Sequence, residues 1–334
     1  MGSSMRKIRV AVVGAGQFGR NHLRVLSGCA GAELVAVVDC DAARAAEAAA
    51  AHGCRALTDL EHLRGLAEAA IVATPTVTHA EVGCALLAMG LDVLVEKPIA
   101  ADMASALRLV DAATRAGRIL QVGHLERFNP AVAALERIKT VPLFFEIHRL
   151  SPFTPRSLDV DVVLDLMIHD LEIVLSLVGR MPQEVRAAGI SVLSDRVDIA
   201  NARLAFPGGV IANLTASRVS TERVRKLRMF QPGQYVSLDY TRQDAAVFEV
   251  TRQRQIAYSR LEVERAEPLR LELEHFLECV RTRREPRVGG AEALRALEVA
   301  LQVLAKIEEH SRAVAETLAS MEASHGGLPP GCER

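Results

Sequence analysis

The strongest constraint on the fold is a regular alternation of short apolar strands with helical segments in the first 124 residues. Runs rich in β-branched residues predict the strands, and the segments between them are long enough for helices. Strands that alternate with helices pair in parallel and are joined by right-handed crossovers. Residues 1–124 are therefore predicted to form a doubly wound α/β domain, with strands at 8–13, 33–38, 69–73, 91–95 and 118–123 and helices at 17–26, 41–51, 77–89 and 101–116.

The pattern changes after residue 124, where strand-like stretches follow one another with few helices between them. Such a succession is typical of an antiparallel sheet. We therefore expect a second, α+β domain over residues 125–334, built on one large open antiparallel sheet. Its predicted strands are 143–150, 184–194, 198–206, 209–218, 225–230, 234–240 and 245–258, its predicted helices are 129–138, 159–178, 268–283 and 291–318, and a frayed tail is expected from about residue 326.

The composition argues against several classes of protein. The 334 residues include 40 basic and 41 acidic side chains, a net charge of −1, so the chain lacks the basic surface of a nucleic-acid or membrane-surface binder. Aromatic residues make up 4%, too few for a base-stacking platform. No apolar run reaches the roughly 20 residues that span a bilayer, and the polar N-terminus does not resemble a signal peptide. Because the six cysteines form no C-x-x-C pair, we expect a cytoplasmic protein with reduced thiols.

A glycine-rich motif follows the first predicted strand directly. Residues 14–19 read Gly-Ala-Gly-Gln-Phe-Gly and open a predicted helix. Glycines in this context permit a tight turn and let the backbone approach a pyrophosphate at the helix N-terminus, as in a Rossmann domain. Asp39, twenty residues after Gly19, would accept hydrogen bonds from a ribose and repel a 2′-phosphate. The motif predicts NAD as the cofactor, and the alternative is an ordinary tight turn without a ligand. Arg44 either holds a 2′-phosphate or lies on a solvated helix face.

A second candidate site lies where the strand at 91–95 ends, in the tripeptide Glu96-Lys97-Pro98. Ligands of doubly wound sheets bind beyond the carboxyl ends of the strands, so Lys97 is expected to face the cofactor crevice. Its ammonium can donate to a substrate hydroxyl and favour the alkoxide-like form. The alternative is a lysine in a surface turn.

A third candidate is a carboxylate and an imidazole on the predicted helix 159–178. Asp165 and His169 are four residues apart, so they share one face of a helix among apolar neighbours. A histidine with a carboxylate one turn away is an oriented base with a tunable pKa. The alternatives are a hydrogen-bonded core histidine and a metal pair, and for the metal pair the sequence offers no convincing third ligand.

Together these motifs resemble the Gfo/Idh/MocA oxidoreductase family over nearly the whole chain. The resemblance rests on the glycine motif, Asp39, Thr74-Pro75-Thr76, Glu96-Lys97-Pro98 and the Asp165/His169 pair. It implies hydride transfer between a nicotinamide and a sugar or polyol carbon, and homodimers or homotetramers that pack through the open sheet. Because the Asp165/His169 pair lacks a convincing third ligand, no metal is expected. Lys97, Asp165 and His169 match the catalytic positions. The positions expected to bind the cofactor are Gly14, Gly16, Gln17, Phe18, Gly19, Asp39, Thr74, Pro75, His79, Glu96 and Lys97.

Two further segments resemble one branch of that family, the UDP-N-acetylglucosamine 3-dehydrogenases. They are residues 123–130 (GHLERFNP) and 158–163 (LDVDVV), the second standing where many members have a Gly-rich segment. The branch implies oxidation of the sugar C3 hydroxyl. The 3-keto sugar nucleotide would then pass to an aminotransferase that serves synthesis of a 2,3-diamino sugar lipid A.

A nucleotide-sugar substrate carries a diphosphate, and arginine is the side chain best suited to bind it. The expected substrate-binding residues are Arg127, Asn129, Arg149 and Arg156, with Arg127 the strongest candidate. Each arginine could instead tie a loop to a nearby carboxylate. The alternative substrates are a nucleotide-linked hexuronic acid, a free sugar or inositol. A non-catalytic dinucleotide sensor is the remote alternative, because Lys97 and His169 are both present.

Overall fold

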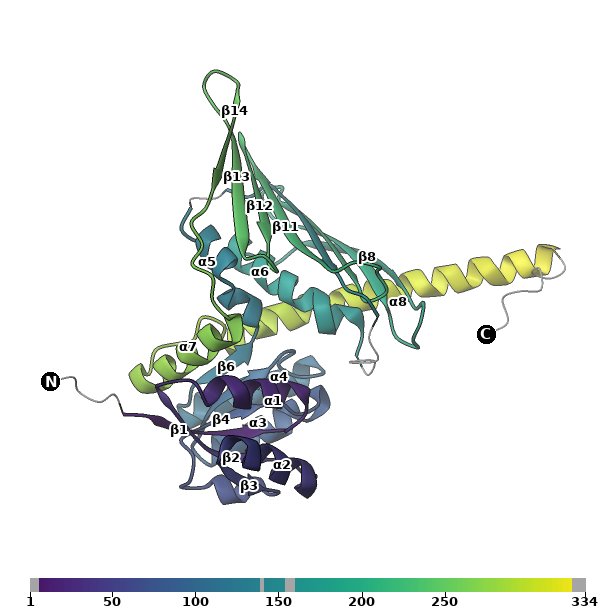
Figure 1. The fold of residues 1–334 in the computed structure, drawn as a ribbon. Helices are drawn as coiled ribbons and strands as arrows, with labels where there is room; N and C mark the ends of the chain where they lie inside the picture. Colours follow the sequence, from purple (N-terminus) through teal and green to yellow (C-terminus); the bar gives the residue numbers. More distant parts are fainter. Residues whose placement is uncertain (1–5, 139–140, 154–159, 326–334) are drawn as a thin grey trace. The chain divides into compact units, whose positions relative to one another are not determined.

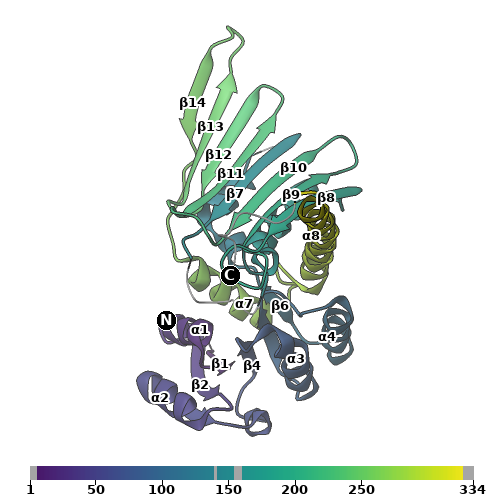
Figure 2. The same ribbon diagram turned by 90° about the vertical axis from the view of Figure 1, so that its right-hand side faces the viewer.

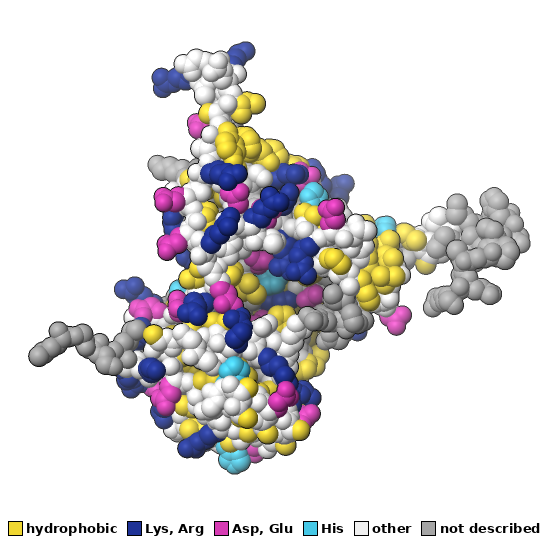
Figure 3. Space-filling model, viewed as in Figure 1, with side chains coloured by type: hydrophobic (Ala, Val, Ile, Leu, Met, Phe, Trp, Pro, Cys, Tyr) yellow, Lys and Arg dark blue, Asp and Glu magenta, His cyan; other side chains and the backbone are white. Residues whose placement is uncertain are grey.

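The computed structural model describes residues 6–138, 141–153 and 160–325. The chain divides into two compact units. The first, the Rossmann unit, contains Met1–Lys139, Leu238–Val247 and Tyr258–Glu298; the second, the sheet unit, contains Thr140–Ser237, Phe248–Ala257 and Val299–Arg334. A domain boundary after residue 124 stays a prediction. Figure 3 shows basic and acidic side chains intermixed over the face in view.

The Rossmann unit is built on a six-stranded sheet in the order β3-β2-β1-β4-β5-β6. The five pairings between its neighbouring strands are parallel, as the sequence predicts. β3 was not expected, because its three residues are mostly exposed and form no apolar run. The strands are β1 (Ile8–Val13), β2 (Ala32–Val38), β3 (Arg55–Leu57), β4 (Ala69–Val72), β5 (Asp92–Glu96) and β6 (Leu120–Gly123).

Local signals explain where the helices of this unit begin and end. Asp41 and Asp102 accept backbone N–H groups at the starts of α2 and α4, and Gly53 and Gly117 end these helices in the left-handed conformation. The helices are α1 (Gln17–Leu26), α2 (Ala42–His52), α3 (His79–Ala88), α4 (Met103–Ala116), α5 (Pro130–Leu135) and α7 (Pro268–Thr282), with short 3-10 turns at Leu60–Leu63, Thr76–Thr78 and Leu125–Phe128 (Figure 1).

One hydrophobic core joins the sheet of the Rossmann unit to a helix from late in the chain. Val10 and Ile71 from the sheet are fully buried, and they belong to the same cluster as Leu273 and Phe276 of α7. The helix packs its apolar face on the sheet, which is the usual way for an amphipathic helix to be stabilised. Residues 268–282 therefore help to build the unit that carries the glycine-rich motif.

The sheet unit contains most of an eight-stranded sheet with the order β14-β13-β12-β11-β7-β10-β9-β8 (Figure 2). The sequence predicts an antiparallel sheet, and this is wrong at one pairing, since β7 and β10 are parallel. β8 and β9 lie between β7 and β10 in the chain, but in the sheet they lie on the far side of β10. β10 therefore pairs directly with β7, and the two strands run in the same direction. The strands are β7 (Phe144–Leu150), β8 (Glu184–Ile190), β9 (Ile199–Ala205), β10 (Ile211–Ser217), β11 (Val224–Gln231), β12 (Gln234–Asp239), β13 (Asp244–Val250) and β14 (Ile256–Arg260).

The predicted long strand 245–258 is a hairpin. β13 ends at Val250 and β14 begins at Ile256, and the amide of Thr251 donates to the carbonyl of Gln255 across the turn. Arg254 takes a positive φ of 58° in this turn. The turn contains no glycine or proline, so the sequence gives no signal that the strand ends there.

One face of this sheet is covered and the other is open. Along β9 the buried residues Ala200, Ala202 and Leu204 alternate with the exposed Asn201 and Arg203. The long helix α8 (Gly290–His325) contributes to the covered face, since a Cβ at Gly189 would lie 3.1 Å from the side chain of Ile307. Within the described residues, no helix is both long and apolar enough to cross a membrane.

Aromatic side chains form a row across four neighbouring strands. The ring of Phe144 on β7 meets Phe230 on β11 edge to face, with 5.9 Å between centroids. Phe230 stacks on Tyr235 at 4.9 Å, and Tyr235 stacks on Phe248 at 5.0 Å. All four are half-buried, so this row, which we call the aromatic row, keeps part of its apolar surface accessible.

The predicted helix 159–178 is not a uniform α-helix. Val163–Met167 forms a π-helical turn, in which the amide of Ile168 donates to the carbonyl of Val163, and α6 (Ile168–Val178) continues from it. Such turns are rare in α-helices and are frequent at functional sites. Residue spacing alone does not reveal them, because a single inserted turn hardly disturbs the apolar pattern.

A buried ion pair ties the start of α6 to the sheet. Arg149 on β7 donates from Nε to Asp170 Oδ2 at 2.7 Å and from Nη2 to Asp170 Oδ1 at 2.8 Å. Both side chains are about 2–3% exposed. A two-pronged contact of this kind fixes orientation as well as distance. The pair therefore holds the first turn of α6 against β7.

Asp170→Asn should destabilise the protein by about 3–5 kcal/mol, because it leaves the buried Arg149 charge without its counter-ion. The matched control is Glu184→Gln, which breaks the Arg186–Glu184 pair at side-chain exposures of 78% and 51%. That exposed pair should cost less than about 1 kcal/mol. Urea unfolding of the two variants measures both values, and equal losses would contradict this role for the buried pair.

Candidate active site

The glycine-rich loop between β1 and α1 is shaped by two close backbone contacts. Gly14 has φ +98°, and a Cβ there would lie 2.5 Å from the carbonyl oxygen of Ala73. A Cβ on Gly19 would lie 1.8 Å from the carbonyl oxygen of Gly14. Both distances are far below van der Waals contact, so only glycine fits these positions. They bring the first turn of α1 against the end of β1 and beside the segment that follows β4.

Gly16 differs from these two glycines because it faces open space. A Cβ built at Gly16 would meet nothing within 4 Å, and Gly16 caps α1 without a side-chain hydrogen bond. No acidic residue lies in the first turn of α1, and Phe18 is 45% exposed. A positive helix end with open space before it fits a pyrophosphate group. The loop therefore suits a dinucleotide on the evidence of its own geometry.

Asp39 connects this loop to the turn after β2. Its Oδ2 accepts the amide of Ala15 at 2.8 Å, and its Oδ1 accepts the amide of Asp41 at 2.9 Å. Oδ1 also accepts the Cys40 thiol at 3.8 Å, whereas Oδ2 can accept a second hydrogen bond, such as one from a ribose hydroxyl. Arg44 lies 3.6 Å from Asp39 Oδ1 and 3.2 Å from Asp41 Oδ2, and is thus paired with two carboxylates.

His79 joins the two loops that carry the other expected cofactor residues. Its Nε2 lies 2.9 Å from the carbonyl oxygen of Thr74, and its Nδ1 lies 2.8 Å from that of Pro98. Burial of the ring lowers the pKa of His79, although the two carbonyls oppose this. Thr74 also accepts a hydrogen bond from the hydroxyl of Thr78. His79 therefore fixes the loop after β4 to the loop after β5.

Glu96, the last residue of β5, sets the backbone at Lys97. Its Oε2 accepts the Lys97 amide at 3.2 Å, and its Oε1 lies 2.7 Å from Nε2 of His22 on α1. Burial opposes the charge on Glu96, but the His22 hydrogen bond and the charges of His22 and Lys97 outweigh it, so the pKa of Glu96 is lowered. Gly123 leaves the space for it, since a Cβ there would lie 3.0 Å from Glu96 Oε2.

Asp165 and His169 occupy the π-helical turn and the start of α6. Asp165 is half-buried and His169 is 8% exposed. A shared face for residues four apart requires a regular α-helix, and the π turn changes the angular spacing between Asp165 and His169. Asp170, the neighbour of His169, carries the ion pair with Arg149, so the backbone at His169 is braced from β7. Within the described residues, no group of three His, Cys, Asp or Glu could hold a metal ion.

The described members of the expected substrate set have protein partners. Arg127 Nη1 donates to Glu136 Oε1 at 2.8 Å, and the Arg149 guanidinium is paired with Asp170. Asn129 caps α5 by accepting the amide of Ala131, and it donates to Glu126 Oε2. Arg156 lies outside the described residues. The substrate-binding role of the four residues stays a prediction.

Three buried residues around Glu96 carry no clear signal in the sequence. His22 is 1% exposed and partners Glu96, and its only sequence signal is its position three residues after Gly19. His124, which follows β6, is also 1% exposed, and burial together with the Lys97 charge lowers its pKa to about 3. Glu272 on α7 is fully buried and far away in sequence. Tertiary packing alone brings these groups together.

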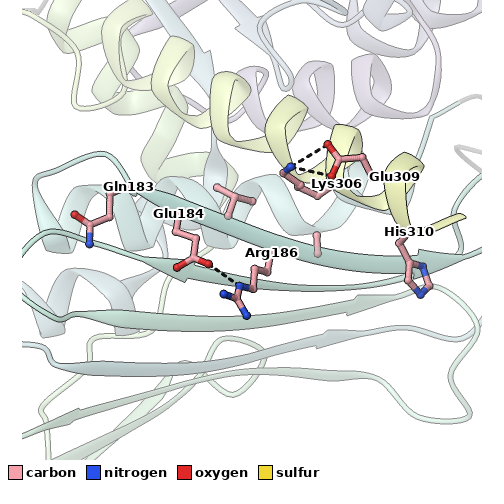
Figure 4. Close-up of a pocket in the computed structure, with 8 residues that line it drawn as sticks. Gln183, Glu184, Arg186, Lys306, Glu309 and His310 are labelled. Atoms are coloured by element: carbon pink, nitrogen blue, oxygen red, sulfur yellow. Dashed lines mark hydrogen bonds and ion pairs between the residues drawn. The ribbon is translucent and has the colours of Figure 1, made fainter. Parts of the chain in front are cut away.

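A groove of about 690 Å³ lies elsewhere, between β8 and α8 of the sheet unit (Figure 4). Its charged lining residues are paired with each other, Lys306 with Glu309 and Arg186 with Glu184. None of the predicted site residues lines it. The groove is thus separate from the candidate active site.

Comparison with known proteins extends what the geometry shows. Residues 8–124 match the NAD-binding Rossmann domain of the Gfo/Idh/MocA oxidoreductases, and residues 137–230 match the C-terminal domain of that family. The chain is 35% identical to a UDP-N-acetylglucosamine 3-dehydrogenase of Acidithiobacillus ferrooxidans, over 91% of this chain and 98% of that protein. An inositol 2-dehydrogenase of Saccharopolyspora erythraea is 36% identical, over 56% of this chain and 58% of that protein.

Solved structures agree with these matches. The crystal structure of the Acidithiobacillus ferrooxidans enzyme superposes with a TM-score of 0.87 at 34% identity, covering 92% of this chain and 99% of that one. The myo-inositol 2-dehydrogenase of Lactobacillus plantarum shares the fold, with a TM-score of 0.77 at 19% identity and coverage of 91% and 98%. The chain therefore belongs to the Gfo/Idh/MocA family of NAD-binding oxidoreductases.

Proposed function

We propose that this protein oxidises the C3 hydroxyl of UDP-N-acetylglucosamine to the 3-keto sugar nucleotide, with NAD as the hydride acceptor. The observation that carries the proposal is similarity to a UDP-N-acetylglucosamine 3-dehydrogenase over nearly the full length of both chains. The inositol dehydrogenases match only about half of this chain. Oxidation of inositol is therefore the second candidate.

The chain's own residues supply binding and proton transfer, and bound NAD supplies a carbon that accepts hydride. Lys97 donates a hydrogen bond to the substrate hydroxyl and stabilises its developing negative charge. His169 accepts the hydroxyl proton, and Asp165 orients the His169 ring and stabilises its cationic form. The ordered backbone at Lys97 and the braced start of α6 support these assignments, because each holds its reactive group in a defined position.

The nucleotide diphosphate is assigned to the arginine-bearing segments. Arg127 donates from Nη1 to Glu136, and its planar guanidinium is a side chain suited to bind two phosphate oxygens at once. The Arg149 guanidinium is paired with Asp170, so a phosphate would have to share this guanidinium with the Asp170 carboxylate. Arg127 is therefore the stronger candidate. Contacts to the diphosphate would supply binding energy remote from C3 and help to position that carbon.

The proposal extends to the cellular setting of the reaction. A 3-keto sugar is a substrate for an aminotransferase, so we place the product before such an enzyme in the synthesis of 2,3-diamino sugar lipid A. We place the protein in the cytoplasm, where thiols stay reduced, and the five cysteines in the described residues are free thiols. We further propose a homodimer or homotetramer that buries the open sheet face, and the half-buried aromatic row supports this surface.

The first prediction concerns the choice of cofactor. Wild-type protein should prefer NAD over NADP, because the buried Asp39 carboxylate repels a 2′-phosphate. Asp39→Ala should reduce the ratio of kcat/KM for NAD to that for NADP by about tenfold or more. Glu47→Gln, at an exposed site on α2, is the control and should leave the ratio unchanged. Equal use of both cofactors by the wild type would refute the assignment of Asp39.

The second prediction concerns the chemistry. Lys97→Ala and His169→Ala should each lower kcat by about 10²–10⁴-fold, the usual contribution of a general acid or base. NAD affinity, measured by isothermal titration calorimetry, should change little in either variant. Lys306→Ala, in the separate groove between β8 and α8, is the control. A variant of either residue with wild-type kcat would remove that residue from the mechanism.

The third prediction concerns the substrate. Free N-acetylglucosamine should have a kcat/KM at least about 10²-fold below that of UDP-N-acetylglucosamine, because it lacks the diphosphate contacts. NADH absorbance measures the rates, and mass spectrometry after coupling to an aminotransferase identifies the product. If the free sugar or inositol reacts as well as the nucleotide sugar, the assigned substrate is wrong, while membership of the family is unaffected.

A further inference from the structure

Glu272 is a buried acid that the proposed reaction does not use. It lies on α7 with 0% exposure, and neither of its carboxyl oxygens has a hydrogen-bond partner in the part of the chain that the structure describes. The side chain of Gln121 on β6 donates to the backbone carbonyl of Glu272 at 3.2 Å, and the Gln121 Oε1 is likewise buried and without a partner there. A buried carboxylate without donors is strongly disfavoured.

Glu96 is a second buried carboxyl in the same region. Gln121 pairs with Leu94 across β5 and β6, two residues before Glu96. The two acids differ in their donors, since Glu96 has His22 and the Lys97 amide. Burial raises the pKa of Glu272 well above its usual range, and the negative charge of Glu96 adds to this rise. Of the two acids, Glu96 is thus the one that ionises.

We propose that Glu272 is a positioning residue that remains a neutral carboxylic acid at neutral pH. In this state Glu96 is the charged member of the two acids, and it keeps both of its donors. An ionised Glu272 would repel Glu96 and compete with it for the nearby positive charges. The other titratable or charged groups on the elements around the two acids include Arg20, His22 and Arg24 on α1, His79 and Glu81 on α3, Asp92 on β5, Arg270, Glu274, His275, Glu278 and Arg281 on α7, and Lys97, His124, Glu126 and Arg127 in the segments after β5 and β6.

Infrared spectroscopy tests the protonation state directly. The wild-type protein in D₂O at pH 7, without substrate, should show the carbonyl stretch of a buried protonated carboxyl group. Glu272→Gln should abolish this band, whereas Glu274→Gln, at an exposed site two residues away, should leave it unchanged. If the wild type shows no such band, or if Glu272→Gln retains it, the proposal is overturned. The wild-type spectrum alone is decisive even if the variant does not fold.

The pH dependence of stability is an independent test. In the unfolded chain Glu272 should titrate near its ordinary pKa of about 4.3. Since the folded-state pKa is higher, the folded state binds the proton more tightly, and stability is lost as pH rises above about 4.3 toward the folded-state value. Over that window the folding equilibrium constant of the wild type should fall about tenfold per pH unit relative to Glu272→Gln. Parallel profiles for the two proteins would contradict the proposal.

The kinetic test alone rests on the proposed function. Glu272→Gln preserves the neutral shape, so its kcat at pH 7 should stay within about twofold of the wild type. As the pH rises into the alkaline range, the kcat of the wild type should fall at a pH where the kcat of Glu272→Gln is still constant. The KM for NAD should stay unchanged in both proteins. An alkaline limb shared by both proteins would contradict the positioning role. Failure of the dehydrogenase assay would leave the spectroscopic and stability tests intact, so the two proposals can fail separately.

Discussion

The cofactor end of the Rossmann unit depends on one backbone contact, the approach of Gly19 to the carbonyl oxygen of Gly14. A Cβ on Gly19 would lie 1.8 Å from that oxygen, so any other residue would push α1 away from β1. The position of α1 in turn sets the position of His22, which reaches Glu96 at the end of β5. Glu96 then fixes the amide of Lys97. A chain of contacts thus runs from the glycine loop to the Lys97 turn.

The sequence predicts this unit well because its signals are local. Strand and helix periods alternate, aspartates and glycines mark helix ends, and the glycine motif directly follows a strand and opens a helix. The expected five strands and four helices of the α/β domain are confirmed within a few residues. The missed strand β3 shows the limit, since it is short and exposed and carries no apolar pattern.

The sheet unit and the environment of the site are less predictable, because they depend on contacts between distant residues. The parallel pairing of β7 with β10 joins residues more than 60 positions apart, and the turn at 251–255 lacks glycine and proline. The π turn at Asp165 leaves the apolar pattern almost unchanged. Arg149 illustrates the same limit, since its residue type fits a phosphate and a carboxylate equally well, and the fold supplies Asp170 as its partner.

Three buried acids differ in the donors that the fold supplies, and the direction of their pKa shifts differs accordingly. Glu96 has His22 and an amide, and its pKa is lowered. Asp198 accepts three backbone amides and the guanidinium of Arg218, and although burial opposes it, the pKa of Asp198 is strongly lowered. Glu272 has no such donors among the described residues, and its pKa moves in the opposite direction. The number of donors that packing brings to each buried acid, rather than burial alone, therefore decides its charge.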